Sequence, residues 1–151
     1  FLGSSRGIHG LSIFVQKRNL MCGICGILAP STHVGVDEEA VVEEMKLRMK
    51  HRGPDGEGTY VSRYGVLGHR RLAVIDLEQG HQPMICEEGR YVLVFNGEIY
   101  NYIEIRSILL SCGYNFKSNG DSEVLIKAFH KWGMRALDKL NGMFSISLFF
   151  R

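Results

Sequence analysis

The chain has 151 residues, of which 45% are hydrophobic and 23% charged, and its formal net charge is +2. This length and composition predict one folded domain, and the small net charge argues against binding to nucleic acid or an anionic membrane. No stretch approaches the roughly 20 apolar residues that cross a bilayer. The sequence shows no export signal, so we expect a cytoplasmic protein.

The chain divides into three parts. Residues 1–20 show no periodicity, and we expect an extension that is disordered or foreign to the domain. Residues 21–143 alternate between helix and strand patterns, and residues 144–151 alternate apolar and small side chains as a strand does. Earlier strands are predicted at residues 22–28, 59–62, 65–69, 72–76 and 91–95. Helices are predicted at residues 37–50, 102–111 and 122–132.

Two of these helices have a defined apolar face. In the first helix, with Asp37 as its N-cap, the predicted face consists of Val41, Val42, Met45 and Met49. In the last helix the face consists of Val124, Leu125, Ala128, Phe129 and Trp132. Residues with this spacing pack in a core and carry no functional meaning of their own.

Cys22 is the most informative residue, because it follows Met21 directly. If translation starts at Met21 and this methionine is removed, Cys22 carries a thiol and a free α-amino group together. Such an amino group has a pKa of roughly 7.7–8.0 and can act as the base for the neighbouring thiol. This indicates an N-terminal nucleophile hydrolase. With residues 1–20 attached, the nitrogen is an amide, and we expect no activity.

The other cysteines do not indicate a metal site or a disulfide framework. Cys22 and Cys25 have the C-x-x-C spacing, but no second such pair follows, and Cys86 and Cys112 are far apart in the sequence. We therefore expect no bound metal.

Three polar clusters each leave two interpretations open. Arg70 and Arg71 enter an apolar strand, so one side chain must point toward the packed side, where a carboxylate ligand would pair with it, unless both are solvated at the strand end. Asn96 and Gly97 form either a tight turn or an oxyanion hole. Either Asp121 or Ser122 is the N-cap of the helix that follows, or the carboxylate of Asp121 binds an ammonium group.

Several motifs in a fixed order bring these clusters together: Met21-Cys22-Gly23-Ile24, 51–55 (His-Arg-Gly-Pro-Asp), 69–76, 81–84 (His-Gln-Pro-Met), 96–101 (Asn-Gly-Glu-Ile-Tyr-Asn) and 140–144. The sequence from residue 21 to about 149 closely resembles the glutaminase domain of glutamine-hydrolysing asparagine synthetases, which are class II glutamine amidotransferases. The resemblance implies an α+β fold, the four-layer αββα sandwich of the N-terminal nucleophile hydrolases, here incomplete at its C-terminal end.

The resemblance also assigns roles. It makes Cys22 the nucleophile, and its α-amino group the base. It implies an oxyanion hole at Asn96 and Gly97 and a clamp for the substrate's α-carboxylate at Arg71. The remaining substrate-binding residues that it implies are Leu72, Ala73, Val74 and Ile75 through their backbone, with Glu98 and Asp121 for the α-ammonium group.

The implied reaction is hydrolysis of glutamine, which supplies ammonia for the ATP-dependent synthesis of asparagine from aspartate. The glutaminase half needs no cofactor. ATP and Mg²⁺ belong to a synthetase domain, normally in the same chain, whose Ser-Gly-Gly-x-Asp-Ser loop does not occur in residues 1–151. A homodimer is a further expectation. Two alternatives stay open: an inactive truncated remnant, and a module that senses glutamine without hydrolysing it.

Overall fold

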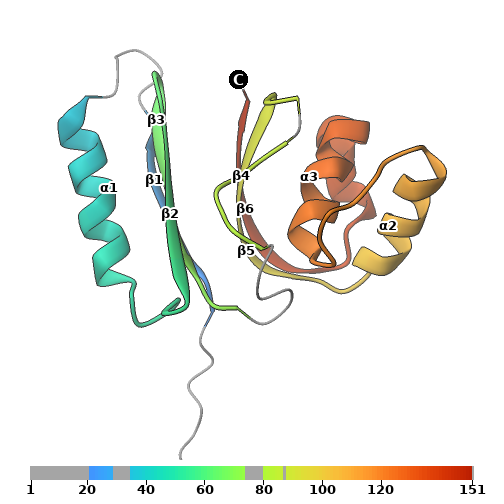
Figure 1. Cartoon of the computed structure of the whole chain (residues 1–151), viewed down its shortest axis with the longest axis horizontal. Coiled ribbons are helices and arrows are strands. Elements are labelled where there is room, and N and C mark those ends of the chain that lie inside the picture. Colours follow the sequence, from blue (N-terminus) through green and yellow to red (C-terminus); the bar gives the residue numbers. More distant parts are fainter. Residues whose placement is uncertain (1–20, 29–34, 74–79, 87, 151) are drawn as a thin grey trace, which may run out of the picture.

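The computed structural model describes residues 21–28, 35–73, 80–86 and 88–150, so the expectations for residues 1–20, Val74 and Ile75 lie outside its described part. Two three-stranded antiparallel sheets face each other between helices (Figure 1). The first sheet has the order β1 (Gly23–Leu28), β3 (Gly65–Arg71), β2 (Gly56–Ser62). The second has the order β4 (Met84–Ile85), β5 (Tyr91–Ile99), β6 (Gly142–Phe150). This arrangement confirms the predicted α+β class.

Helices cover the outer faces of both sheets (Figure 1). Helix α1 (Val36–Arg48) packs on the first sheet, while α3 (Asp121–Trp132) packs on the second and α2 (Tyr102–Ser111) packs against α3. A 3₁₀ helix, η1 (Gly133–Lys139), leads into β6. None of the helices in the described ranges has the length and apolar character that crossing a membrane requires.

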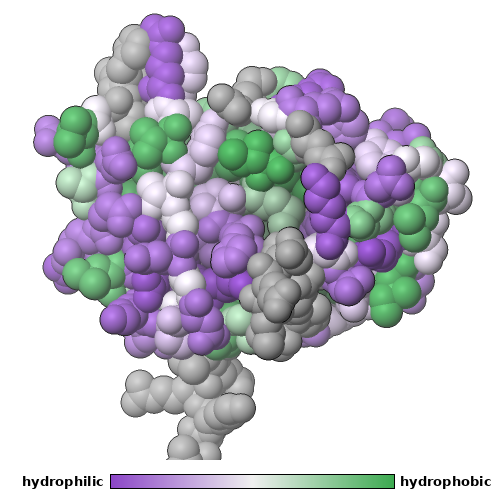
Figure 2. All heavy atoms as spheres, viewed as in Figure 1, coloured by the Kyte–Doolittle hydropathy of each residue, from purple (hydrophilic) through white to green (hydrophobic). Residues whose placement is uncertain are grey.

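Two hydrophobic clusters hold the layers together. The larger lies between the second sheet and its helices, and the smaller lies between the sheets, where Leu67 packs with Val92 and Val94. Alternation along β3 also places Gly68 on the opposite face, directly beneath Val42 of α1. On the surface shown in Figure 2, hydrophilic residues predominate, and hydrophobic ones form separate patches.

The local predictions fail at two places in the first half of the chain. Helix α1 has Gly35, not Asp37, as its N-cap, and Val41 and Met45 of its predicted apolar face are exposed, whereas Lys46 is buried. Lys46 pairs with Glu43 at 2.9 Å, which satisfies its charge under the helix. The strand predicted at 72–76 is wrong for its first two residues, because β3 ends at Arg71.

The tight-turn interpretation of Asn96 and Gly97 is also wrong. Both lie inside β5, which continues to Ile99 because β6 pairs with it along its whole length, with Gly97 opposite Phe144. Gly97 has φ of +148°, and a Cβ there would lie 2.2 Å from the Met143 carbonyl oxygen. Only glycine fits this position without strain.

Candidate active site

One cavity of about 360 Å³ gathers residues from six separate segments of the chain, two of which are the segment before β4, with Gln82, and strand β6, with Met143. The segment before β1, the end of β3, the second half of β5 and the start of α3 contribute to its walls. Its lining includes most of the predicted site residues: Cys22, Arg71, Leu72, Asn96, Gly97, Glu98 and Asp121. A second cavity of about 260 Å³, between β4 and α3, contains none of them.

The Cys22 thiol lies against the residue that follows β3. Its Sγ accepts a hydrogen bond from the Leu72 N–H at 3.2 Å and lies 3.6 Å from the Leu72 carbonyl oxygen. Burial raises the pKa of this thiol, while the Leu72 backbone and the charge of Arg71 act in the opposite direction. A thiol with a raised pKa is mostly protonated at neutral pH, so it needs a base before it can attack a carbonyl carbon.

The turn at residues 51–55, which is one of the ordered motifs, supports the end of β3. The Asp55 N–H donates to the Arg71 carbonyl at 3.0 Å, and Asp55 Oδ2 accepts from the Ala73 N–H at 2.9 Å. Gly53 lets this turn approach, because a Cβ there would lie 2.4 Å from the carbonyl carbon of Arg70. Asp55 thus holds the backbone on both sides of Leu72, the residue that contacts Cys22.

Arg71 is buried at the edge of the cavity, and its neighbour Arg70 is directed elsewhere. Arg70 pairs with Glu57 of β2, on the face of the sheet that α1 covers. The two arginines therefore point to opposite faces, as the strand alternation predicts, and Arg71 lines the cavity. The interpretation of both as a solvated pair is wrong, since both are only 6% exposed.

Asp121 has a structural bond as well as a place in the cavity. It is the first residue of α3 and follows the N-cap Gly120, so neither Asp121 nor Ser122 is the N-cap. Asp121 Oδ2 accepts from the Ile99 N–H at 3.1 Å. Burial raises the pKa of this carboxyl group, which backbone hydrogen bonds partly oppose. Glu98, in contrast, is exposed.

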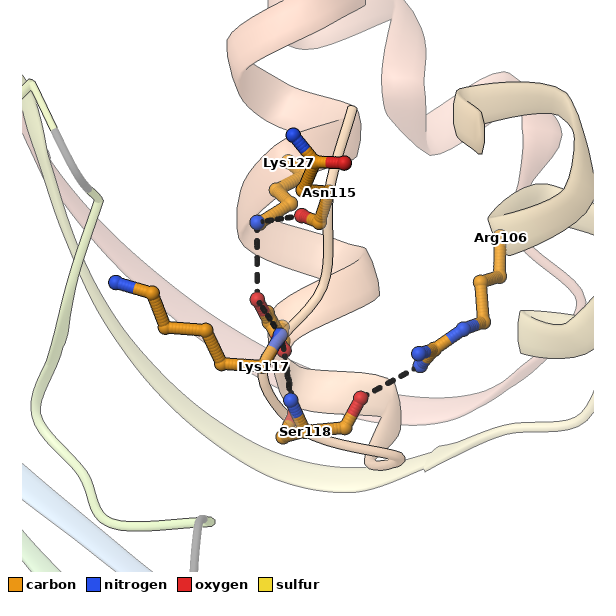
Figure 3. A network of polar contacts seen from close by, with 6 residues as sticks. Arg106, Asn115, Lys117, Ser118 and Lys127 are labelled. Carbon is orange, nitrogen blue, oxygen red and sulfur yellow. Dashed lines mark hydrogen bonds and ion pairs between the residues drawn. The ribbon is translucent and has the colours of Figure 1, made fainter. Parts of the chain in front are cut away.

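A polar network holds the loop that leads into α3 (Figure 3). The carboxylate of Glu123 accepts hydrogen bonds from the N–H and hydroxyl of Ser118, both at 2.6 Å, and pairs with Lys127 at 2.9 Å. Arg106 of α2 donates to the Ser118 carbonyl at 2.7 Å. Although burial acts to raise it, the bonds from Ser118 and Lys127 lower the pKa of Glu123 to about 2. The network fixes the loop residue Ser118, shortly before Asp121, to the first turn of α3.

The predicted backbone contacts after Arg71 are met only in part. Leu72 lines the cavity, but Ala73 does not, and its N–H is used by Asp55. Val74 and Ile75 lie outside the described residues. The residue roles that sequence reasoning missed are those of Asp55 and of Gln82, which also lines the cavity. The only signal for either in the sequence was its place in one of the ordered motifs.

Comparison with known proteins decides the family of this site. Residues 21–151 match the family described as the glutamine amidotransferase domain. The chain belongs to this family. The amidotransferase domain is 40% identical over 127 residues to asparagine synthetase (glutamine-hydrolyzing) 1 of Bacillus subtilis strain 168, a match that covers 83% of this chain and 20% of that protein.

A second relative gives the same picture. Asparagine synthetase B (glutamine-hydrolyzing) of Escherichia coli K12 is 36% identical over 129 residues, which is 85% of this chain and 23% of that protein. The amidotransferase domain thus spans about a fifth of the length of these curated relatives.

Solved structures support the fold of the amidotransferase domain. The allosteric regulatory enzyme of purine biosynthesis matches with a TM-score of 0.50 and 20% identity over 87% of this chain and 29% of that one. The glutamine phosphoribosylpyrophosphate amidotransferase of B. subtilis also has a TM-score of 0.50, with 23% identity over 60% of this chain and 22% of that one. At these identities the likeness concerns the fold alone.

Proposed function

We propose that this domain hydrolyses the side-chain amide of glutamine and supplies the ammonia to a synthetase domain that makes asparagine from aspartate with ATP. The observation that carries the proposal is the convergence of Cys22, Arg71, Asn96, Gly97 and Asp121 on one cavity. A nucleophile, hydrogen-bond donors and charges of both signs are the groups that a zwitterionic amide substrate requires.

In the proposed reaction the thiol of Cys22 gives its proton to the α-amino group of the same residue, and the sulfur attacks the amide carbon of glutamine. The side-chain N–H of Asn96 and the backbone N–H of Gly97 stabilise the resulting oxyanion. As the C–N bond breaks, the α-ammonium group returns the proton to the leaving nitrogen, and ammonia departs. Water then hydrolyses the thioester to glutamate and restores the thiol.

The two charged ends of the substrate would be held by residues on different elements. Arg71 would pair with the α-carboxylate, and Asp121 with the α-ammonium group, assisted by Glu98 at the exposed rim. Fixing both ends of the substrate orients the amide carbon toward the sulfur, which lowers the barrier as well as strengthening binding.

ATP and Mg²⁺ belong in this proposal to the synthetase domain. Within the part of the chain that the structure describes, no group of three or more His, Cys, Asp or Glu side chains could hold a metal ion. The proposal also includes a cytoplasmic location, and a homodimer stays a prediction.

The test is release of ammonia from glutamine by a form of the protein whose first residue is Cys22. We expect turnover in this form and none in its Cys22→Ala variant, because only Cys22 supplies the sulfur. Cys25→Ala is the matched control, since Cys25 is also a partly buried free cysteine close by in the chain, and it should retain turnover. Equal release by Cys22→Ala would refute the assignment of the nucleophile.

The 151-residue chain serves as a second comparison. With residues 1–21 attached, we expect glutamine binding without turnover, because the nitrogen of Cys22 is then an amide. Equal turnover in the longer form would refute the α-amino group as the base. If the form beginning at Cys22 also binds glutamine tightly without turnover, a sensor is favoured, and failure of both forms to fold favours an inactive remnant.

A further inference from the structure

Strand β5 continues well beyond its partner β4. The two residues of β4 pair with Val92 and Leu93 only, so no strand of the described part accompanies β5 on that side from Val94 onward. The unpaired stretch includes Asn96 and Gly97. Backbone N–H groups that face this side inside the protein need acceptors from elsewhere.

Two side chains supply those acceptors, one on each side of the oxyanion-hole segment. Gln82 Oε1 accepts from the Phe95 N–H at 2.6 Å, and Asp121 Oδ2 accepts from the Ile99 N–H at 3.1 Å. Phe95 and Ile99 enclose residues 96–98. The side-chain acceptors thus replace the missing strand at both ends of this short segment.

Gln82 is itself firmly placed. Its side chain is buried, and its Nε2 donates to the Ser122 hydroxyl at 3.4 Å, at the start of α3. Its backbone packs on the first sheet so closely that a Cβ on Gly58 would lie 2.1 Å from the Gln82 carbonyl oxygen. Gln82 therefore contacts the first sheet through its backbone and links β5 to α3 through its side chain.

We propose that Gln82 is a positioning residue for the oxyanion hole, which holds Asn96 and Gly97 in place through the Phe95 N–H. This inference rests on the proposed glutaminase function. Without the acceptor, a buried N–H loses its partner, and the strand must shift to find another. Because a shift of about 1 Å at reacting groups can cost roughly 100-fold in rate, we expect the loss to appear in kcat.

Two variants of nearly equal shape separate the acceptor from packing. Gln82→Met keeps the length of the side chain and removes the acceptor, and we expect kcat to fall about 10- to 100-fold, with KM for glutamine changed by less than about threefold. Gln82→Glu keeps an oxygen for the Phe95 N–H and should hold kcat within about threefold of the parent. Ser122→Ala removes only the 3.4 Å hydrogen bond from Gln82 to α3, and it should also hold kcat within about threefold of the parent.

The reactivity of Cys22 with iodoacetamide is a control inside the site. Alkylation needs the sulfur but no oxyanion hole, so Gln82→Met should react at the rate of the parent. The proposal is overturned if Gln82→Met retains its kcat, or if the Met and Glu variants lose kcat equally.

Amide hydrogen exchange in the 151-residue chain tests the inference without turnover. In Gln82→Met we expect exchange to become at least 10-fold faster at residues 95–97 and to stay unchanged at 92 and 93, where pairing with β4 and β6 persists. Unchanged exchange at 95–97 would overturn the role of Gln82. If the form that begins at Cys22 releases no ammonia while exchange is faster in the variant, the proposed function is refuted and the positioning role remains supported.

Discussion

His69 should make the stability of this domain fall as the pH falls below 6.5. The residue lies in β3, its side chain is completely buried, and neither ring nitrogen makes a hydrogen bond of normal geometry within the described part of the chain. Burial lowers the pKa of the imidazole from 6.5 to about 4, because the charged form would lose its hydration; the backbone of Phe95 opposes this effect, and the charge of Arg71 adds to it.

The size and the direction follow from this difference in pKa. Each pH unit between the two values corresponds to 1.36 kcal/mol, so the full effect is about 3 kcal/mol. Above pH 6.5 neither state binds the proton. Between pH 6.5 and 4 only the unfolded state binds it, so the free energy of unfolding decreases as the pH falls. Between pH 7.5 and 5 we expect a loss of about 2 kcal/mol.

Urea unfolding at pH 7.5, 6.5, 5.5 and 5 measures this loss, with His69→Leu as the comparison. Leucine has no titrating group and suits the apolar space between the sheets, where Leu67 packs. Asp121 has a raised pKa in the folded state, so protonation of its carboxyl group at lower pH favours folding and opposes the loss of stability. Because both proteins contain Asp121, its contribution cancels in the difference between them. The parent should lose about 2 kcal/mol more than His69→Leu over this range.

An equal dependence on pH in the two proteins would refute the reasoning. It would mean that the buried imidazole is protonated in the folded state at ordinary pH, or that other groups account for the change. A larger loss in His69→Leu would contradict the predicted sign directly.

Two further predictions concern the frame of the site. Gly53→Ala should destabilise the domain by about 1–3 kcal/mol in urea unfolding, because its Cβ would lie 2.4 Å from the Arg70 backbone. The control Gly56→Ala, whose Cβ meets nothing closer than 3.6 Å, should destabilise it clearly less. Equal losses of stability in the two variants would contradict the packing argument. Asp121→Asn keeps an oxygen for the Ile99 N–H but loses the charge, so KM for glutamine should rise about 10-fold or more while the melting temperature changes little; an unchanged KM would exclude Asp121 as the ammonium partner.

Helix α3 and strand β6 show what short-range patterns determine. The spacing of Val124, Leu125, Ala128 and Phe129 predicted a buried helical face, and these residues are buried in the structure. The alternation from residue 144 onward predicted a strand, which the structure contains as part of β6. Burial in α3 extends beyond this face, since every residue from Asp121 to Phe129 is buried. The period of the pattern was nevertheless enough to predict the type of each element.

Asn96 and Gly97 show where such patterns fail. Taken locally, they are typical of a turn, but they extend β5 because β6, more than 40 residues later in the chain, pairs with them. The face of α1 fails for a similar reason, since Lys46 is buried only because Glu43 and Glu57 lie within reach of its charge. Strand β6 in the first case and Glu57 of β2 in the second come from distant parts of the chain, whereas Glu43 lies three residues from Lys46 in α1.

From the sequence alone it could be predicted that a cysteine next to a methionine has the chemistry of a nucleophile, and that the ordered motifs belong to an amidotransferase. Those conclusions depend on the identity and order of residues. Only the tertiary structure decided that Asp55 holds the backbone around Leu72 and that Gln82 and Asp121 complete the open side of β5. Such hydrogen bonds join groups whose separation in space depends on how the sheets and helices pack, and no local spacing of residues determines that distance.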